Sequence, residues 1–279
     1  MADKKSSEVR EYQTANCGIF FVVRKHLYKG ESPFQKIEVF ENEDFGHVLM
    51  LDGLVQTTDR DEFYYHEMIV HPPLVTHPDP RNVLIIGGGD GGALREVLRY
   101  GCVEHAWLVE IDSQVVEVAR TYFPWLKPAL KDPRSELVVD DGVRFIAQTG
   151  HKFDVVIIDS SDPVGPSSPL HSREFYESLK KRLNTGAIVT AQVGSPLFHL
   201  DFIEKKYRFF QDLFPIARTY LGPTPTYPGG SWCYVFLSDG ISPFDPKREP
   251  PSGLKIFNAV VLRAAFDLPN FLRERLEPK

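Results

Sequence analysis

The sequence predicts an α/β fold in which helices cover both faces of a mostly parallel β-sheet, preceded by a small N-terminal antiparallel β unit. Two patterns along the chain predict it. Between about residues 19 and 58, short β-rich runs are broken by Gly, Pro and Asn-Glu-Asp turns, without the periodicity of a helix. After residue 82, apolar runs of four to six residues alternate with amphipathic stretches, which is typical of repeated βαβ units.

The expected elements follow one another in a regular order. The β-rich runs of the first part are 19–30, 34–42 and 47–58. The apolar runs VLII, AWLVEI, LVVD, DVVIID and AIVTAQV predict strands at 83–86, 106–111, 137–140, 154–159 and 187–193. The amphipathic stretches between them predict helices at 92–101, 113–123, 141–150 and 173–186. Gly101, Gly150 and Gly186 end three of these stretches, where glycine is common after a helix. A Pro-rich linker at 242–253 is expected before a final helix at 254–266.

Charge and composition restrict the kinds of partner. The net charge of −6 and the pI near 5.9 argue against a protein that binds nucleic acid through a basic surface. A mild excess of acidic residues is compatible with small cationic ligands. The three cysteines are far apart and no run is apolar enough for a signal peptide or a membrane helix. We therefore expect reduced thiols and a cytoplasmic location, with no membrane partner.

A glycine-rich loop follows the first strand of the larger unit. In VLIIGGGDGGALREV, Gly87, Gly89 and Gly92 have the G-x-G-x-x-G spacing between a strand and a helix. This spacing lets the backbone turn tightly and approach a ligand closely. Asp90 lies inside the loop and would repel a phosphate, so a cationic ligand is favoured here.

Acidic residues follow each of the next three strands. Ligands of open parallel sheets bind at the carboxyl ends of the strands. Glu110 ends the second strand, at about the distance from the glycines where an acid accepts hydrogen bonds from ribose. Asp141 follows the third strand, within reach of a purine amine, and Asp159 and Asp162 follow the fourth. Because buried carboxylates are costly without a cation, these residues predict a nucleoside that carries positive charge.

Several longer motifs together resemble one family. YYHEM, VLIIGGGDGGALREVL, VEID, DDG, DSSDPVGP and TPTYPGGSW are similar in content and order to those of the spermidine synthases, the polyamine aminopropyltransferases. The resemblance runs from about Gln35 to Pro269. It implies a methyltransferase-like Rossmann domain after a small β domain, and we expect these domains at residues 1–62 and 63–279.

The same resemblance implies a reaction. The family transfers the aminopropyl group of decarboxylated S-adenosylmethionine to a diamine and releases methylthioadenosine. Putrescine is the expected acceptor and spermidine the product. Decarboxylated S-adenosylmethionine is a co-substrate, so neither a bound cofactor nor a metal is expected. The resemblance also implies a homodimer or homotetramer.

Site residues are carried over from the matching motifs. The expected catalytic residues are Asp159 and Tyr65, which would bind the attacking amine and remove its proton. The expected donor-binding residues are Gln35, Gln56, His66, Gly87, Gly88, Asp90, Glu110, Asp141, Gly142 and Ser160. The expected acceptor-binding residues are Asp162, Gln192, Tyr227 and Trp232. Asp90 would bind the donor amine and repel the carboxylate of intact S-adenosylmethionine, which would select the decarboxylated donor.

Other interpretations compete with this one. A methyltransferase that uses S-adenosylmethionine, an aminopropyltransferase for cadaverine or agmatine, and a noncatalytic nucleoside-binding protein remain open. A dehydrogenase is weaker, because Asp90 would face the pyrophosphate of NAD. Asp162 could instead cap a turn before Pro163, and Tyr65 could be a packing residue.

Two local sequence features add further expectations. His66, Glu67 and His71 lack the i, i+4 histidine spacing of a zinc helix, so we expect no zinc site there. The segment from Ser167 to His171 lacks the aromatic residue that many family members carry in this loop, which leaves the preferred amine acceptor open.

Overall fold

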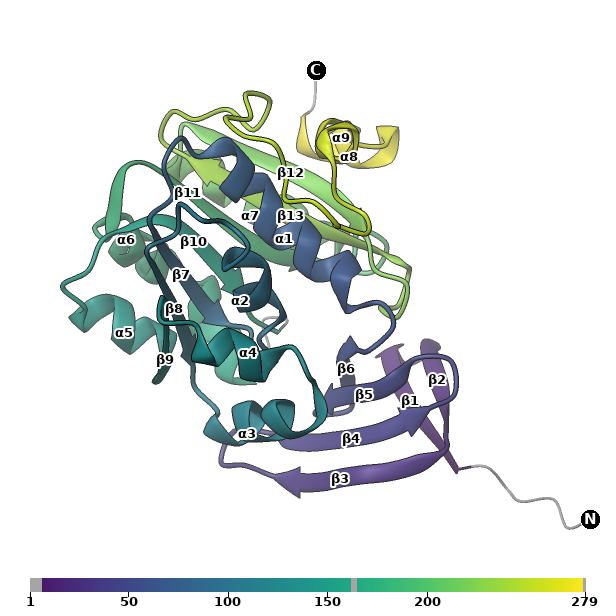
Figure 1. Ribbon diagram of the computed structural model, residues 1–279. Coiled ribbons are helices and arrows are strands. Elements are labelled where there is room, and N and C mark those ends of the chain that lie inside the picture. Colours follow the sequence, from purple (N-terminus) through teal and green to yellow (C-terminus); the bar gives the residue numbers. More distant parts are fainter. Residues whose placement is uncertain (1–6, 162–164, 278–279) are drawn as a thin grey trace, which may run out of the picture.

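A seven-stranded sheet forms the centre of the larger part of the protein (Figure 1). The computed structural model describes residues 7–161 and 165–277. The strands are β7 (Asn82–Gly87), β8 (His105–Glu110), β9 (Ser135–Val139), β10 (Phe153–Asp159), β11 (Leu183–Gly194), β12 (Ile216–Pro223) and β13 (Ser231–Ser238), in the spatial order β12-β13-β11-β10-β7-β8-β9. Neighbours are parallel except at β13, which is antiparallel to both β11 and β12. The predicted mostly parallel sheet is therefore confirmed.

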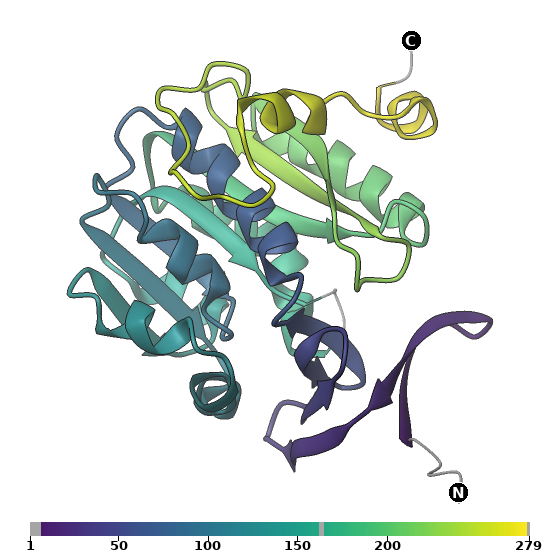
Figure 2. The ribbon, with the colours of Figure 1, turned by 45° about the vertical axis from the view of Figure 1, so that its right-hand side comes forward.

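Helices cover both faces of this sheet (Figure 2). The described helices are α1 (Glu62–Thr76), α2 (Gly92–Val97), α3 (Ser113–Tyr122), α4 (Leu126–Lys131), α5 (Gly142–Gln148), α6 (Arg173–Lys180), α7 (Leu200–Leu213), α8 (Ala259–Ala265) and α9 (Asn270–Leu276), with a short 3₁₀ helix η1 (Gly165–His171); α3 packs on the N-terminal strands instead. None of the described helices is both long and apolar enough to cross a membrane.

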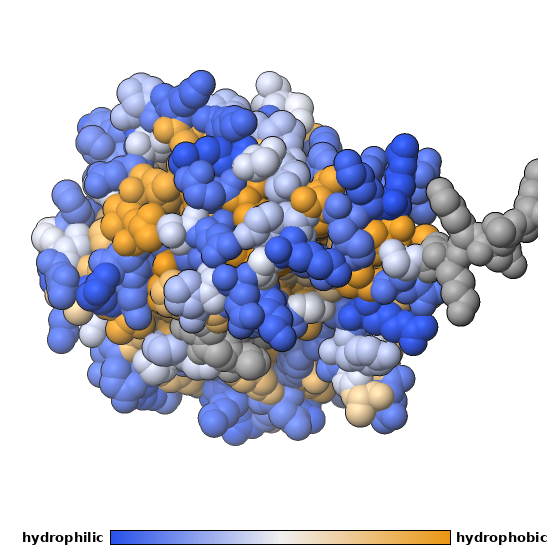
Figure 3. All heavy atoms as spheres, turned by 90° about the horizontal axis from the view of Figure 1, so that it is seen from below, coloured by the Kyte–Doolittle hydropathy of each residue, from blue (hydrophilic) through white to orange (hydrophobic). Residues whose placement is uncertain are grey.

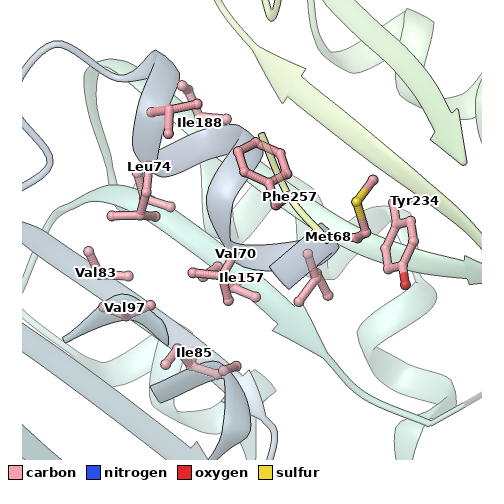
Figure 4. Close-up of a cluster of buried hydrophobic side chains, with 14 of the residues drawn as sticks. Met68, Val70, Leu74, Val83, Ile85, Val97, Ile157, Ile188, Tyr234 and Phe257 are labelled. Atoms are coloured by element: carbon pink, nitrogen blue, oxygen red, sulfur yellow. The ribbon is translucent and has the colours of Figure 1, made fainter. Parts of the chain in front are cut away.

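Alternate residues of the central strands build two separate cores. Val83 and Ile85 of β7 pack with α1 and α2, whereas Leu84 and Ile86 belong to the cluster formed with α5, α6 and α7. This alternation follows from the two-residue period of a strand. Figure 4 shows the first cluster, in which Met68, Val70 and Leu74 of α1 lie close to the strands. A sheet buried on both faces explains the nearly continuous apolar runs in the sequence.

The N-terminal strands form two small antiparallel sheets. A hairpin contains β1 (Ser7–Thr14) and β2 (Cys17–Val23), and a four-stranded sheet contains β3 (Lys25–Glu31), β4 (Lys36–Asn42), β5 (Gly46–Leu51) and β6 (Leu54–Thr58). Ile37 and Val39 of β4 pack on α3, whereas Phe40 packs on the opposite face with Phe21 of β2. Figure 3, a view from below, shows hydrophobic residues that reach the surface among hydrophilic ones.

Some elements differ from the expectation. The hairpin strand β1 lies before residue 19, where no strand was predicted, because its sequence is mostly polar. The helix expected at 173–186 ends at Lys180, and Gly186 lies inside β11 with a φ of +79°. The helix expected at 254–266 covers only Ala259–Ala265, because Asn258 caps it and is itself extended, and it is not the final helix, since α9 follows it.

Candidate active site

One cavity collects the predicted site residues at the carboxyl ends of the central strands. It lies where the strand order reverses between β7 and β10, the position where open α/β sheets bind ligands. The predicted residues that line it are Gln35, Gln56, Tyr65, His66, Gly87, Gly88, Asp90, Glu110, Asp141, Gly142, Asp159, Ser160, Gln192, Tyr227 and Trp232. Asp162 lies outside the described residues. The structure thus brings together residues that the sequence separates by up to about 200 positions, while their roles stay predictions.

The glycine loop requires glycine at its start. Gly87 and Gly88 have φ angles of +81° and +67°, which L side chains rarely adopt. A Cβ atom on Gly87 would lie 2.2 Å from the carbonyl oxygen of Asp159. The Gly88 amide donates to that same oxygen at 2.8 Å. The loop after β7 is therefore fixed directly against the end of β10.

Asp90 lies in this loop beside a histidine. One of its carboxylate oxygens accepts a hydrogen bond from the Gly92 amide at 2.9 Å, and the other lies 3.4 Å from Nε2 of His66. Nδ1 of His66 is 2.7 Å from the carboxylate of Glu62. Burial lowers the pKa of His66, but Asp90 and Glu62 outweigh it and raise that pKa well above its usual range. The two carboxylates thus favour the protonated, cationic form of His66 next to Asp90.

Half-buried Asp159 at the end of β10 and buried Tyr65 of α1 lie in the same cavity. Both side chains line the cavity, and each of them shifts the pKa of the other. Burial, opposed by the positive charge of His66, raises the pKa of Asp159 to about 6. Burial and the Asp159 charge raise the pKa of Tyr65 well above its usual range, so the phenol keeps its proton. The arrangement suits a carboxylate that accepts a proton near neutral pH.

Glu110 ends β8 as a second buried carboxyl group. Its Oε1 accepts a hydrogen bond from the Asp112 amide at 2.9 Å. Burial raises its pKa to about 7. Asp112 in turn accepts hydrogen bonds from Gln35 at 3.0 Å and from Ser32 at 2.6 Å, which fixes Gln35 at the rim of the cavity. Ribose hydroxyls would supply the hydrogen-bond donors that an ionised Glu110 needs.

Asp141 also has a structural role that the sequence prediction did not include. It is the N-cap of α5, where Oδ1 accepts hydrogen bonds from the amides of Val143 at 2.7 Å and Arg144 at 3.3 Å. Both bonds use the same oxygen, and Asp141 lines the cavity. The cap therefore fixes the carboxylate at the cavity wall.

Aromatic side chains and an amide form the other wall. Nε1 of Trp232 donates to Oε1 of Gln192 at 2.9 Å, and Nε2 of Gln192 donates to the Ser160 carbonyl at 2.9 Å. The Tyr227 ring packs edge-on against Trp232, with 4.7 Å between centroids. The Tyr227 hydroxyl donates to the Gln56 carbonyl at 2.7 Å. Apolar rings with fixed polar atoms can accommodate the methylene chain of a diamine.

The N-terminal hairpin supplies two lining residues that the sequence interpretation missed. Glu11 is 4% exposed, and its Oε2 accepts a hydrogen bond from the Val55 amide at 2.8 Å. The amide nitrogen of Gln13 lies 2.9 Å from Nε2 of His199, next to α7. Both residues line the cavity. Their spacing of two places them on one face of β1, which would have been informative had that strand been recognised.

The histidines near the start of α1 face different partners. His66 contacts Glu62 and Asp90, whereas His71 contacts Glu96 and Tyr100. Within residues 7–161 and 165–277, no group of three or more His, Cys, Asp or Glu side chains could hold a metal ion.

Comparison with known protein families gives two matches that cover most of the chain. The profile of the spermine/spermidine synthase domain matches residues 62–245. The profile of the spermidine synthase tetramerisation domain matches residues 9–59.

Individual proteins match nearly end to end. The polyamine aminopropyltransferase of Shouchella clausii is 42% identical over 269 residues, which cover 96% of this chain and 98% of the relative. That of Thermotoga maritima is 43% identical, with 95% and 92% covered. The crystal structure of a spermidine synthase in complex with the transition state analogue AdoDATO matches with a TM-score of 0.94 and 41% identity, covering 98% of this chain and 96% of that one. The crystal structure of spermidine synthase from Thermotoga maritima matches with a TM-score of 0.92 and 41% identity, covering 98% and 95%.

Proposed function

The chain belongs to the spermine/spermidine synthase family, and on that premise we propose that it is an aminopropyltransferase. It transfers the aminopropyl group of decarboxylated S-adenosylmethionine to putrescine and releases spermidine and methylthioadenosine. The observation that carries this proposal is the convergence of Asp90, Asp159 and Tyr65 on one cavity. These residues provide a binding site for an ammonium group and a proton acceptor for a second amine.

The reaction begins with removal of a proton from the acceptor. A free amine titrates near pH 10, so most of the acceptor arrives as an ammonium that has no lone pair. Asp159 accepts that proton, while Tyr65 holds the carboxylate in place. The amine then attacks the methylene carbon bound to the sulfonium, so that a C–N bond forms and the C–S bond breaks. The bonding pair moves to sulfur, which becomes the neutral thioether of methylthioadenosine.

The donor residues orient the methylene carbon toward the amine. Asp90 binds the ammonium of the aminopropyl group, Glu110 binds the ribose hydroxyls, and Asp141 faces the adenine. Gln35, Gln56, His66, Gly142 and Ser160 complete that site. Alignment of the amine with the C–S bond supplies much of the acceleration. The sulfonium is already an activated leaving group, so we propose that the donor is a co-substrate and that no metal or bound cofactor takes part.

The acceptor occupies the aromatic side of the cavity. Gln192, Tyr227 and Trp232 line its methylene chain, and Asp162, which lies outside the described residues, is proposed to meet its nitrogen. Cadaverine and agmatine differ from putrescine only in length and end group. Incubation with decarboxylated S-adenosylmethionine and each amine, with products identified by mass, tests the acceptor, and we expect spermidine to dominate.

The same assay tests the reaction itself. Supply of intact S-adenosylmethionine should give no product, whereas the decarboxylated donor should release methylthioadenosine in equal amount to spermidine. Methyl transfer from the intact donor without release of methylthioadenosine would replace this proposal with a methyltransferase.

Assembly into a homo-oligomer is part of the proposal. The profile that matches residues 9–59 is described as a tetramerisation domain, and we propose a homodimer or homotetramer built through it. Phe20 and Val22 expose 62% and 45% of their surface on the hairpin and are available for such contacts. We also propose a domain boundary at residue 62, a cytoplasmic location, and no nucleic acid or membrane partner. Sedimentation velocity distinguishes monomer, dimer and tetramer.

A further inference from the structure

His66 lies between two carboxylates, one at each ring nitrogen. Nδ1 is 2.7 Å from Glu62 and Nε2 is 3.4 Å from Asp90. Only a doubly protonated imidazole can donate at both positions. The ring is 2% exposed, and a Cβ atom on Gly92 would lie 2.1 Å from its Cε1, so its position is closely fixed.

Glu62 is held on its other side by an arginine. Arg95 of α2 donates to both carboxylate oxygens of Glu62, at 2.9 and 2.7 Å. Burial raises the pKa of Glu62, but His66 and Arg95 lower it to about 2, so the group stays ionised at neutral pH. Glu62 is 7% exposed and is not among the described residues that line the cavity. It therefore acts on the cavity only through other side chains.

We propose that Glu62 is a positioning residue for the donor amine, which it affects by fixing the proton and orientation of His66. This inference rests on the proposed function. With Nδ1–H committed to Glu62, Nε2 points to Asp90, the group that meets the ammonium of the donor. The negative charge of Glu62 also offsets Arg95, which would otherwise leave a positive charge near a doubly cationic donor.

The groups around His66 define what its charge affects. They are Glu62 and Tyr65 on α1, Asp90 in the glycine loop and Asp159 on β10, with Arg95 of α2 behind Glu62. The positive charge of His66 favours the ionised form of Asp159. Loss of Glu62 should make protonation of His66 less favourable, which raises the pKa of Asp159. Asp159 should then need a higher pH to be ionised and accept a proton.

Two ligands that differ in the aminopropyl group separate a positioning role from a structural one. Decarboxylated S-adenosylmethionine carries the ammonium and the sulfonium, whereas methylthioadenosine shares the nucleoside and is neutral. Glu62→Gln should weaken binding of the first by about tenfold and leave the second within about twofold. The acid limb of kcat/KM should move to higher pH, and Glu62→Asp, which keeps the charge, should restore part of the donor affinity.

Glu96 provides the matched control. It is 2% exposed, accepts a hydrogen bond from Arg95 at 2.8 Å and contacts His71 at 3.1 Å. It thus has the same kinds of partner as Glu62, but its histidine, His71, is not among the described residues that line the cavity, whereas His66 is. Glu96→Gln should lower stability while the ratio of the two affinities stays as in the wild type.

The outcomes separate the two proposals. An equal loss of both affinities in Glu62→Gln, an unchanged donor affinity, or the same ratio change in Glu96→Gln overturns the role of Glu62. If the wild-type chain releases no methylthioadenosine from the decarboxylated donor, the proposed function itself fails. If the wild type does so and the affinity ratio of Glu62→Gln is unchanged, only the inference about Glu62 fails.

Discussion

The carbonyl oxygen of Asp159 accepts a hydrogen bond from the amide of Gly88 at 2.8 Å. This contact joins the end of β10 to the loop after β7 through main-chain atoms. The backbone that carries the proposed proton acceptor and the backbone of the proposed donor-binding loop are therefore held in a fixed relative position. In-line displacement requires such a fixed position, because small misplacements of the reacting groups lower the rate strongly.

Gly87→Ala should damage this junction. The new Cβ atom would lie 2.2 Å from the Asp159 carbonyl oxygen, at a φ of +81° that alanine rarely adopts. We expect a loss of about 1–3 kcal/mol in the free energy of unfolding, and lower turnover because Asp159 moves. Urea unfolding and steady-state kinetics measure the two effects. Gly101→Ala is the control, since a Cβ atom there meets nothing within 4 Å. Equal stability of the two variants would contradict the prediction.

The central βαβ pattern could be predicted because it is encoded locally. The strands β7, β8 and β10 and the second half of β11 are buried almost throughout, so each is a short apolar run, and α3 and α6 are amphipathic. The helix α1 was missed because it is buried nearly all round and contains Pro72 and Pro73, which leaves no amphipathic pattern. The strand β1 was missed because its buried member is an acid, Glu11.

The site could be predicted only in part, for a related reason. Asp90, Glu110 and Asp159 end or follow recognisable strands, so topology alone brings them to one edge. The contribution of Gln13 depends on how the hairpin packs against the rest of the chain, which no local pattern encodes. Glu62 was also missed, because an acid at a helix start is common and its role depends on the tertiary contacts with His66 and Arg95.

Asp159→Asn should remove the proton acceptor. We expect turnover to fall by about a hundredfold or more, the usual scale for loss of a general base, while the donor still binds. Product formation by mass spectrometry and donor titration measure the two quantities. Near-normal turnover would exclude Asp159 as the base.

The pH dependence of the wild type should report the same group. Burial raises the pKa of Asp159 to about 6, so the carboxylate takes up a proton as the pH falls through that value. A protonated acid cannot accept the proton of the amine, so kcat/KM should decrease about tenfold per pH unit below about pH 6. A profile that stays flat down to pH 5 would contradict this assignment.

Asp90→Asn should weaken donor discrimination. Asparagine keeps an oxygen for the Gly92 amide but loses the charge that attracts the donor ammonium and repels the carboxylate of intact S-adenosylmethionine. We expect the ratio of the two donor affinities to fall by about tenfold, which competition binding against methylthioadenosine would measure. Unchanged selectivity would refute the argument from charge repulsion.

Glu110→Gln should make the protein more stable and weaken its binding of the nucleoside. Burial raises the pKa of Glu110 from an ordinary 4.5 to about 7 in the folded state. Between these values the folded protein binds more protons than the unfolded chain, so this residue lowers stability as the pH rises. A neutral glutamine avoids that cost, and the variant should gain about 1–3 kcal/mol in the free energy of unfolding at pH 8.

The loss of function should appear in ligand binding. Glutamine keeps an oxygen for the Asp112 amide but offers the ribose hydroxyls a weaker, uncharged acceptor, so methylthioadenosine should bind about tenfold more weakly. Glu136→Gln on the neighbouring strand β9 changes an exposed carboxylate and should alter stability by less than about 0.5 kcal/mol. The pH dependence decides between mechanisms, because a gain that arises from ionisation must shrink as the pH falls toward 4.5. A gain of equal size at pH 5 and pH 8 would instead mean that packing, and not the buried charge, sets the stability at this position.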